Sequence, residues 1–326
     1  TNKYDGNAGI YPSVMPNENL TWEVTDQLDA GIELALFDNR VMFTGDYFNK
    51  VTKNLLFSKN MPNTSGFSDV QTNIGKVRFW GFDIDITTRN IVRKNFTWET
   101  KFTWSYVRNK VLELPDNGRD RNRIGGITLA DGTAFGGTAE GEPLYRYYGY
   151  KISHILQTPE EAANALYDNS SVGYDPLTGK SQKGQKFAGD YEWMNRPGSE
   201  KIVIDGEERE MISNQDQFLL GYTVPHSTGG LGNTIVFRNW TFNLYLDWAL
   251  GHSILNDTEA RYFINTFTSN TAISSKVKDC WTHVGDTDAK YAKFQTDGPL
   301  QSANFRDSDV FNDRADYLCI REVSIA

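Results

Sequence analysis

The feature that most constrains this chain is an alternation of aromatic and polar side chains over residues 95–106, NFTWETKFTWSY, interrupted only by Thr100 on the aromatic parity. Aromatic side chains occupy one parity of this stretch, and polar or charged side chains occupy the other. Successive side chains of a β-strand point to opposite faces of the sheet, so the stretch predicts a strand with one aromatic and one polar face. In a soluble sheet the aromatic face would line a core. In a transmembrane barrel it would contact lipid, and the polar face would line a wet interior.

The same alternation recurs along the chain and predicts a set of long strands. For example, Phe82, Ile84 and Ile86 alternate with polar side chains. The predicted strands are residues 22–36, 41–56, 73–88, 95–111, 228–237, 240–252 and 316–326. The clearest helical segment is residues 158–169, in which Thr158 would cap the helix and Pro159 would occupy its first position.

The lengths of the connections bear on the choice between a soluble sheet and a barrel. Short turns are expected at 38–39, within 89–94 and at 238–239, and long connections at about 57–72, 113–227 and 253–315. Such long connections are uncommon in compact soluble domains, where the median is about 4 to 6 residues. A regular alternation of short and long connections is typical of a transmembrane barrel with tight periplasmic turns and large external loops.

Residues 143–156, PLYRYYGYKISHIL, also have the composition of a strand. If this segment crossed the membrane, the long stretch after it would lie on the side of the short turns. We therefore expect it to lie inside the external loop 113–227. The number of spanning strands is then odd, whereas single-chain bacterial barrels have an even number from about eight upward. This predicts that the chain is part of a larger barrel.

Composition excludes several function classes. The formal net charge is −9 and no basic cluster is evident, which argues against a nucleic-acid partner. The 2 cysteines and 4 histidines lack metal-site spacing, and no nucleophile elbow or phosphate-binding loop is present. The sequence therefore predicts no catalytic residues, no metal and no cofactor, and hence a protein that is not an enzyme.

Several long blocks resemble a known family. They are NENLTWEVTDQLDAGIELALFDNRVMFTGDYFNKVTKNLL, SGFSDVQTNIGKVRFWGFDIDI, EGEPLYRYYGY and the terminal DYLCIREVSIA. These blocks are similar to the carboxy-terminal part of SusC-like TonB-dependent outer-membrane transporters of Bacteroidetes. The similarity is strong over about residues 17–115 and returns near 140–157, 221–256 and 316–326.

The resemblance implies an all-β fold, an antiparallel transmembrane β-barrel with long extracellular loops, of which this chain would form part of 22 strands. Residues 1–326 would be the carboxy-terminal portion, with the plug domain and the last strands outside the chain. The segment at Ala188, Gly189 and Asp190 lacks the alternating acids of the calcium-binding loop that follows it in many relatives, so no metal is expected there.

The resemblance also implies a location and partners. The protein would sit in the lipid of the bacterial outer membrane and import oligosaccharides or peptides, driven by a TonB-type energy transducer acting through the amino-terminal region. A SusD-like surface lipoprotein would cover it. The alternatives are a soluble or surface-exposed β-sheet glycan-binding module and a siderophore-type TonB-dependent receptor.

Two sets of residues follow as candidates for function. The side chains expected to face lipid are Phe96, Trp98, Phe102, Trp104, Phe242, Leu244, Leu246 and Trp248. Aromatic residues of the long loops could stack on the apolar faces of sugars, and these are Tyr145, Tyr147, Tyr148, Tyr191, Trp193 and Trp281. The competing interpretation of the loop aromatics is that they pack the loops against each other or against a partner.

Overall fold

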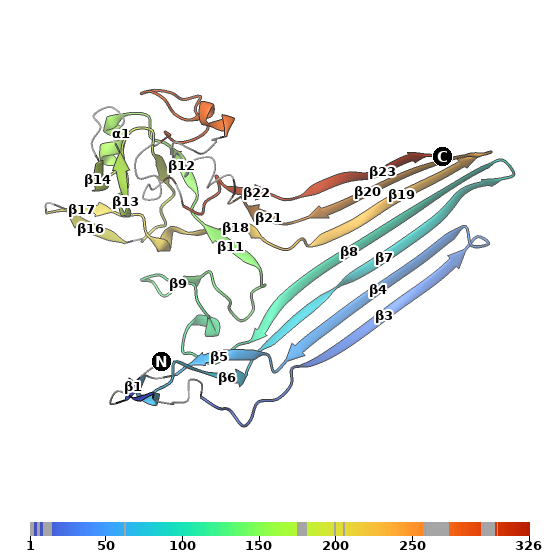
Figure 1. Cartoon of the computed structure of the whole chain (residues 1–326), viewed down its shortest axis with the longest axis horizontal. Coiled ribbons are helices and arrows are strands. Elements are labelled where there is room, and N and C mark those ends of the chain that lie inside the picture. Colours follow the sequence, from blue (N-terminus) through green and yellow to red (C-terminus); the bar gives the residue numbers. More distant parts are fainter. Residues whose placement is uncertain are drawn as a thin grey trace.

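The computed structural model describes residues 3–4, 7–8, 15–61, 63–174, 181–198, 200–204, 206–256, 258, 274–294, 304 and 306–326. Their main element is a 7-stranded antiparallel sheet that crosses the right-hand side of Figure 1. Its strands are β3 (Val24–Leu36), β4 (Val41–Lys53), β7 (Lys76–Arg93), β8 (Phe96–Glu113), β19 (Ser227–Phe237), β20 (Trp240–Leu250) and β23 (Tyr317–Ile325). These are the predicted strands, with small shifts at their ends except in β7, which continues well past its predicted end at residue 88.

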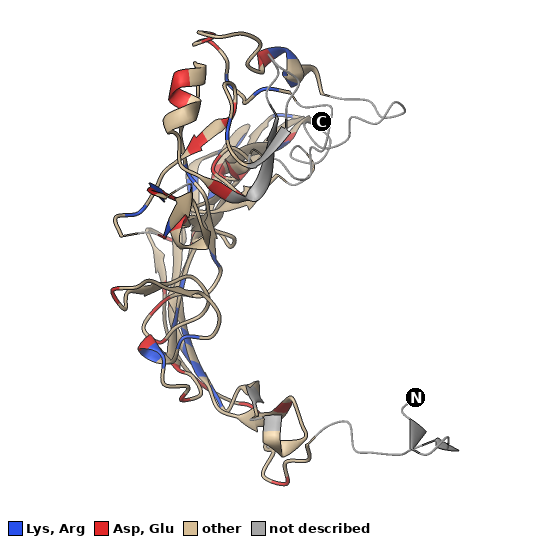
Figure 2. Cartoon of the chain, turned by 90° about the vertical axis from the view of Figure 1, so that its left-hand side faces the viewer, with Lys and Arg blue, Asp and Glu red and all other residues tan. Residues whose placement is uncertain are grey.

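The strands lie in the spatial order β23-β20-β19-β8-β7-β4-β3, so every neighbour in the sheet is also the next long strand in the chain. This is the strand order of an up-and-down antiparallel barrel. Figure 2 shows that the sheet is curved, as expected for a segment of barrel wall.

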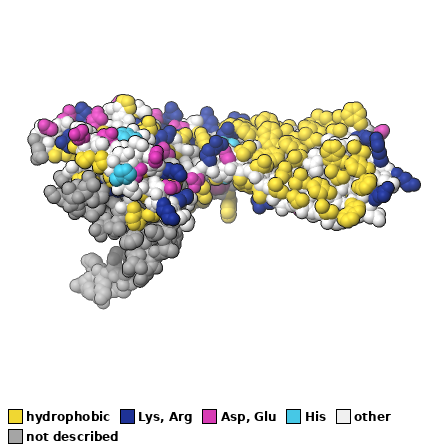
Figure 3. Space-filling model, turned by 90° about the horizontal axis from the view of Figure 1, so that it is seen from above, with side chains coloured by type: hydrophobic (Ala, Val, Ile, Leu, Met, Phe, Trp, Pro, Cys, Tyr) yellow, Lys and Arg dark blue, Asp and Glu magenta, His cyan; other side chains and the backbone are white. Residues whose placement is uncertain are grey.

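The register of the sheet separates apolar from polar side chains across all of its strands. One row of paired residues is apolar throughout, and consists of Leu34, Phe43, Ile86, Phe102, Leu231, Leu246 and Ile320. The adjacent row is largely polar, and consists of Glu33, Thr44, Asp85, Thr103, Gly230, Asp247 and Cys319. Adjacent rows point to opposite faces, so the sheet has one apolar and one polar face. Figure 3 shows hydrophobic side chains gathered over the long strands.

The short connections all lie at one end of the sheet. Residues 37–40 join β3 to β4, residues 94–95 join β7 to β8, and residues 238–239 join β19 to β20. The turns at 38–39 and 238–239 are confirmed. The turn expected within 89–94 was wrong, because β7 continues to Arg93 after a register shift between Arg89 and Ile91. That shift breaks the alternation on which the prediction depended.

A close approach of two strands depends on a glycine in β19. A Cβ atom on Gly229 would lie 2.2 Å from Cζ2 of Trp248 and 2.4 Å from the backbone oxygen of Thr103. The indole of Trp248 therefore lies directly over the Gly229 backbone on the apolar face. An aromatic ring that covers a glycine in this way fills the space that a missing side chain would leave in the sheet.

The long connections carry short two-stranded sheets. They pair β5 (Leu56–Asn60) with β6 (Asp69–Asn73), β9 (Ile127–Thr128) with β10 (Ala134–Phe135), β11 (Arg146–Gly149) with β18 (Phe218–Tyr222), β12 (Ile152–Ile155) with β15 (Tyr191–Trp193), β13 (Asp168–Tyr174) with β14 (Ser181–Gly184), β16 (Lys201–Ile204) with β17 (Glu207–Glu210), and β21 (Ser253–Leu255) with β22 (Asn312–Arg314). A further pair, β1 (Lys3–Tyr4) and β2 (Asn7–Ala8), lies near the amino end.

Segment 143–156 contributes β11 and β12 to these small sheets and not to the wall, as predicted. The predicted helix is α1 (Pro159–Asn164), and Oγ1 of Thr158 accepts a hydrogen bond of 3.1 Å from the backbone N–H of Glu161. Its extension to residue 169 was wrong, because β13 begins at Asp168 and pairs with β14. No helix in the described part of the chain is long and apolar enough to cross a membrane.

Candidate functional site

The two longest connections fold together into one unit beyond the end of the sheet, at the upper left of Figure 1. We call the described residues of 114–226 the first connection and those of 251–316 the second connection, and the two together the loop unit. A buried cluster of Tyr191, Trp193 and Ile212 from the first connection packs on Ala292 from the second. The backbone N–H of Tyr150 donates to the carbonyl of Asp307 over 2.9 Å, and the N–H of Asp309 donates to the carbonyl of Tyr150 over 3.0 Å. The loops therefore share a core and backbone pairing.

Buried ion pairs also join the two connections. Nζ of Lys293 lies 3.1 Å from Oδ1 of Asp190, and each side chain is 3% exposed. The same carboxylate accepts hydrogen bonds from Nδ2 of Asn304 over 2.9 Å and from the backbone N–H of Phe187 over 2.8 Å. Arg306 forms a second ion pair with the fully buried carboxylate of Asp168. The Asp190 side chain thus serves as a structural anchor between loops.

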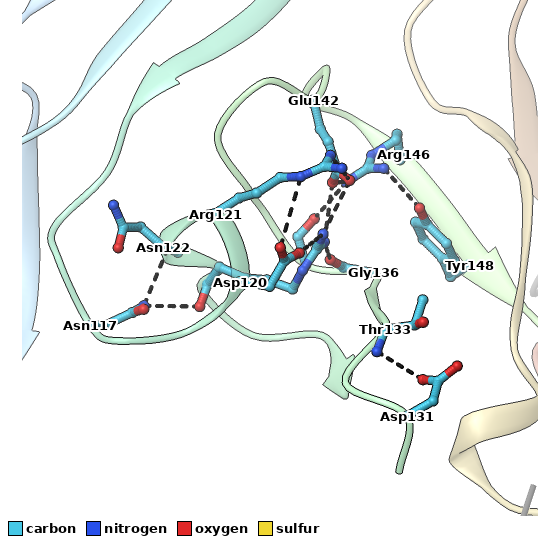
Figure 4. A network of polar contacts seen from close by, with 12 residues as sticks. Asn117, Asp120, Arg121, Asn122, Asp131, Thr133, Gly136, Glu142, Arg146 and Tyr148 are labelled. Carbon is cyan, nitrogen blue, oxygen red and sulfur yellow. Dashed lines mark hydrogen bonds and ion pairs between the residues drawn. The ribbon is translucent and has the colours of Figure 1, made fainter. Parts of the chain in front are cut away.

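Near the start of the first connection, three arginine side chains surround the carboxylate of Glu142 (Figure 4). Arg123 is 2% exposed and donates from Nη1 to Oε2 of Glu142 and from Nη2 to its Oε1, each over 3.1 Å. Arg146 pairs with the same carboxylate, and Arg121 approaches Oε1 of Glu142 to 3.2 Å. Burial by itself would raise the pKa of Glu142, but the hydrogen bonds and charges of Arg123 and Arg146 outweigh it and hold that pKa below its ordinary value.

This cluster positions β11, which carries Tyr147 and Tyr148, two of the predicted loop aromatics. The backbone of Glu142 accepts a hydrogen bond of 2.9 Å from the N–H of Val111, at the end of β8. Nη1 of Arg146 donates to the hydroxyl of Tyr148 over 2.8 Å. The Tyr148 ring lies 5.9 Å from the ring of Phe135 in β10. Glu142 therefore couples the end of the barrel wall to β11 and its tyrosines.

The six predicted loop aromatics occupy two different environments. Tyr145 is 50% exposed beside β11, and Tyr147 and Tyr148 are half-buried. In contrast Tyr191, Trp193 and Trp281 are buried, at 0%, 1% and 3% exposure. Burial raises the pKa of the Tyr191 hydroxyl far above its ordinary value. Tyr191 and Trp193 belong to the shared core of the loop unit, and the Trp281 ring lies against Gly189. Tyr145 is therefore the most accessible candidate for contact with a ligand or partner.

The sequence offered no signal for a stacked arginine next to β11. The guanidinium of Arg196 lies 4.2 Å from the ring centroid of Phe135 and 4.5 Å from that of Phe218. It also donates from Nη2 to the carbonyl of Gln217 over 2.6 Å. These residues lie far apart in the chain, so only the fold brings them together.

Among the open grooves of the described residues, two are lined by several polar side chains and lie where a solute could pass. One of about 600 Å³ lies beside α1 and is lined by His154, Thr158, Glu160, Glu161, Asn164 and Glu192, among others. One of about 290 Å³ lies on the sheet and is lined mainly by polar-face residues, including Asp46, Asp83, Asp85, Thr103, Ser105 and Thr228. Such linings can hydrogen-bond hydroxyl or amide groups. Within the described ranges, no three His, Cys, Asp or Glu side chains are grouped so that they could hold a metal ion.

The eight residues predicted to face lipid share one face of the sheet. Those of β8 and β20 pair with alternate residues of β19, from Gly229 to Phe237, all of one parity. Phe102 and Leu246, for example, both pair with Leu231, and the rings of Phe102 and Trp248 lie 5.7 Å apart. Contact of this face with lipid stays a prediction.

This chain is similar in sequence to a known protein family and to several of its members. Residues 2–200 match the family described as TonB dependent receptor-like, beta-barrel. The chain is 32% identical over 252 residues, 77% of its length, to TonB-dependent receptor P3 of Formosa agariphila, and 31% identical over 243 residues to TonB-dependent receptor SusC of Bacteroides thetaiotaomicron. The aligned parts make up only 22% and 21% of those two relatives.

Solved structures show the same fold. A structure of the RagAB peptide transporter superposes on the whole chain with a TM-score of 0.66 at 16% sequence identity, and the match covers 31% of that chain. An open state of the RagAB peptide importer gives a TM-score of 0.68 over 99% of this chain. The match to the family, the up-and-down sheet and the one-sided apolar face agree, and the chain belongs to the TonB-dependent receptor β-barrel family of the bacterial outer membrane.

Proposed function

We propose that the chain is the carboxy-terminal part of the barrel of an energy-coupled importer. In this proposal residues 1–326 supply seven wall strands and three extracellular connections, and the plug and remaining strands come from other parts of a longer protein. A TonB-type transducer acting on the plug supplies the energy. The transported substrate is an oligosaccharide or a peptide.

The observation that carries the proposal is the one-sided arrangement of the connections. The turns at 37–40, 94–95 and 238–239 close one end of the sheet, whereas the loop unit stands at the other end. A wall with an apolar face, a polar face and large loops at one end fits a solute pathway through an outer membrane. Soluble proteins rarely expose an apolar band of this extent, which argues against a soluble glycan-binding module.

The substrate class is supported by the chemistry of the polar surfaces. The groove beside α1 offers carboxylates, an amide and a hydroxyl, and the polar face offers Asp46, Asp83 and Thr103. These groups can bond the hydroxyls of an oligosaccharide or the amides of a peptide. RagAB, which shares the fold, is described as a peptide transporter.

The proposed partner is a SusD-like surface lipoprotein that covers the loop unit. Tyr145 is 50% exposed and Val224 is 43% exposed, and the N–H of Thr223 donates to the carbonyl of Tyr145 over 2.9 Å. Exposed tyrosine next to apolar side chains is typical of the central part of a protein interface. We expect the lipoprotein to contact this patch.

Growth experiments with the full-length gene test the function. Deletion should abolish growth on at least one oligosaccharide or peptide mixture as sole nutrient, while growth on the corresponding monosaccharides or amino acids continues. The intact gene should restore growth only in cells that have a working TonB-type transducer. Equal growth of the deletion strain on every mixture, or uptake without the transducer, would contradict the proposal.

A separate experiment tests the partner. Tyr145 has a φ of 64°, a conformation that asparagine tolerates well, so Tyr145→Asn removes the ring with little effect on the backbone. Co-purification of the lipoprotein should fall in this variant and stay unchanged in Val284→Asn, which alters an exposed apolar residue elsewhere in the loop unit. Unchanged co-purification in both variants would place the contact elsewhere.

A further inference from the structure

The end of the sheet that carries the short turns is basic, in a chain whose net charge is −9. The three turns and the residues beside them carry the exposed cations Arg40, Arg93, Lys94 and Arg238, against the single exposed carboxylate of Asp38. The nearby Arg89 forms an ion pair with Glu99, with 3.7 Å between Nε of Arg89 and Oε2 of Glu99. Figure 3 shows Lys and Arg side chains at this tip, next to the hydrophobic side chains of the long strands.

The turns are neighbours in space, because the hairpins β3–β4, β7–β8 and β19–β20 follow one another across the sheet. The backbone N–H of Arg238 donates to the carbonyl of Asn95 over 2.9 Å, and the N–H of Arg89 donates to the carbonyl of Arg40 over 2.7 Å. Among the described residues, none of the four cations forms an ion pair. Their charge is therefore free to attract an external anion.

The position of these cations relative to the aromatic residues identifies the kind of anion. Phe237 and Trp240 pair across the β19–β20 turn and are 49% and 64% exposed. The guanidinium of Arg238 lies 5.4 Å from the ring centroid of Phe237, and the Phe237 and Phe96 rings lie 6.4 Å apart. Aromatic rings at the edge of an apolar band occupy the depth of lipid headgroups, so cations just beyond them lie at the level of the phosphates.

We propose that Arg40, Arg93, Lys94 and Arg238 bind the headgroups of anionic phospholipids in the leaflet that borders the short turns. The apolar band and the cations then form one continuous lipid-binding surface, with the acyl chains on Phe237 and Trp240 and the headgroup phosphate on the basic turns. The protein would thus gather anionic lipid around this end of its wall. This inference rests on the membrane location of the barrel and not on any particular substrate.

Brominated lipids provide the test, because bromine quenches tryptophan fluorescence at short range. The full-length transporter is reconstituted in phosphatidylcholine vesicles that contain brominated phosphatidylglycerol or brominated phosphatidylcholine, and the signal of Trp240 is isolated by difference from Trp240→Phe. We expect the anionic lipid to bind at this site with roughly threefold to tenfold preference at low salt, falling toward unity at high salt.

Two variants and a control make the result specific. The preference should fall in Arg93→Gln with Lys94→Gln and in Arg40→Gln with Arg238→Gln. It should persist in Arg119→Gln with Lys278→Gln, which removes two exposed cations from the loop unit. A gel shift between heated and unheated samples confirms that each variant is folded. Equal quenching of the wild type by both lipids, or a preference that both tip variants retain, would overturn the proposal.

Discussion

Asp190 and Lys293, which belong to different connections of the barrel wall, form an ion pair of 3.1 Å in which each side chain is 3% exposed. A buried ion pair is costly to break, because the remaining charge then lacks a partner. Lys293→Met should therefore destabilise the loop unit by about 3 to 5 kcal/mol. Limited proteolysis of the full-length protein should show cleavage in both connections while the barrel stays heat-modifiable.

The control for this prediction is an exposed ion pair in the same connection. Nζ of Lys290 lies 3.3 Å from Oδ2 of Asp279, and the two side chains are 71% and 46% exposed. Lys290→Met should change stability by less than about 1 kcal/mol. If both variants are cleaved at the same rate, the Asp190–Lys293 pair does not hold the two connections together.

The buried aromatic core makes a second prediction about the same unit. Trp193 is 1% exposed and its ring lies 5.6 Å from that of Tyr191. Trp193→Ala should lower the stability of the loop unit by about 3 to 5 kcal/mol, because it leaves a large cavity in a core shared by both connections. Hydrogen exchange should accelerate in residues 274–294 as well as around residue 193. Faster exchange restricted to the first connection would show that the connections fold independently.

A third prediction concerns acid. The arginines around Glu142 hold its pKa below the ordinary value of 4.5, so its interactions stabilise the folded state above that pH. This contribution is lost as the pH falls through the lowered pKa of the folded protein. Protease resistance of residues 114–148 should therefore drop in the acid range below about pH 4.5.

Substitution at Glu142 separates this cause from general acid unfolding. Glu142→Gln should reduce protease resistance at neutral pH, because the buried Arg123 then keeps only Asp120 as a carboxylate partner, and it should make protease resistance depend less on acid. Glu208→Gln, in an exposed pair with Lys201, should leave the profile unchanged. An identical acid response in the wild type and Glu142→Gln would rule out this carboxylate as the source.

A fourth prediction distinguishes the two faces of the sheet. Trp104 lies on the apolar face opposite Ile84 and Gly229, whereas Thr103 lines the polar groove beside Asp85. Trp104→Arg should lower the free energy of unfolding by about 2 to 4 kcal/mol if the face contacts lipid. Thr103→Arg should change it little. Urea unfolding of the full-length protein in lipid vesicles measures both. Equal costs at the two positions would contradict the lipid-facing assignment.

Local pattern was sufficient to predict the wall but not the loop unit. Most wall strands carry an alternation of period two over much of their length, and the pairing of Leu34 with Phe43 or of Phe102 with Leu231 follows from matching those alternations. The end of β7 was missed, because a register shift at Arg89 interrupts the pattern. The short β5–β6 hairpin inside the expected connection 57–72 gives too brief a signal to detect.

The contacts of the loop unit join residues that are distant in the chain. Asn304 bonds Asp190 across 114 positions, and Arg306 bonds Asp168 across 138. No periodicity connects such residues, because their pairing depends on how two long segments wrap around each other. For the same reason the burial of Tyr191, Trp193 and Trp281 could not be distinguished from ligand binding by the sequence.

The sidedness of the chain is the central claim, and labelling of single cysteines in intact cells tests it most directly. Asp131→Cys places a thiol at the exposed tip of the β9–β10 hairpin in the loop unit, and Lys94→Cys places one in the short β7–β8 turn. The half-buried Cys319 is replaced by serine in all variants, burial raises the pKa of Cys280 to about 11 and keeps its background reaction low, and the protein without an added cysteine measures what remains. A membrane-impermeant maleimide should label residue 131 in intact cells and residue 94 only after lysis. Labelling of residue 94 in intact cells, or of both residues alike, would contradict a barrel wall with its loop unit outside the cell.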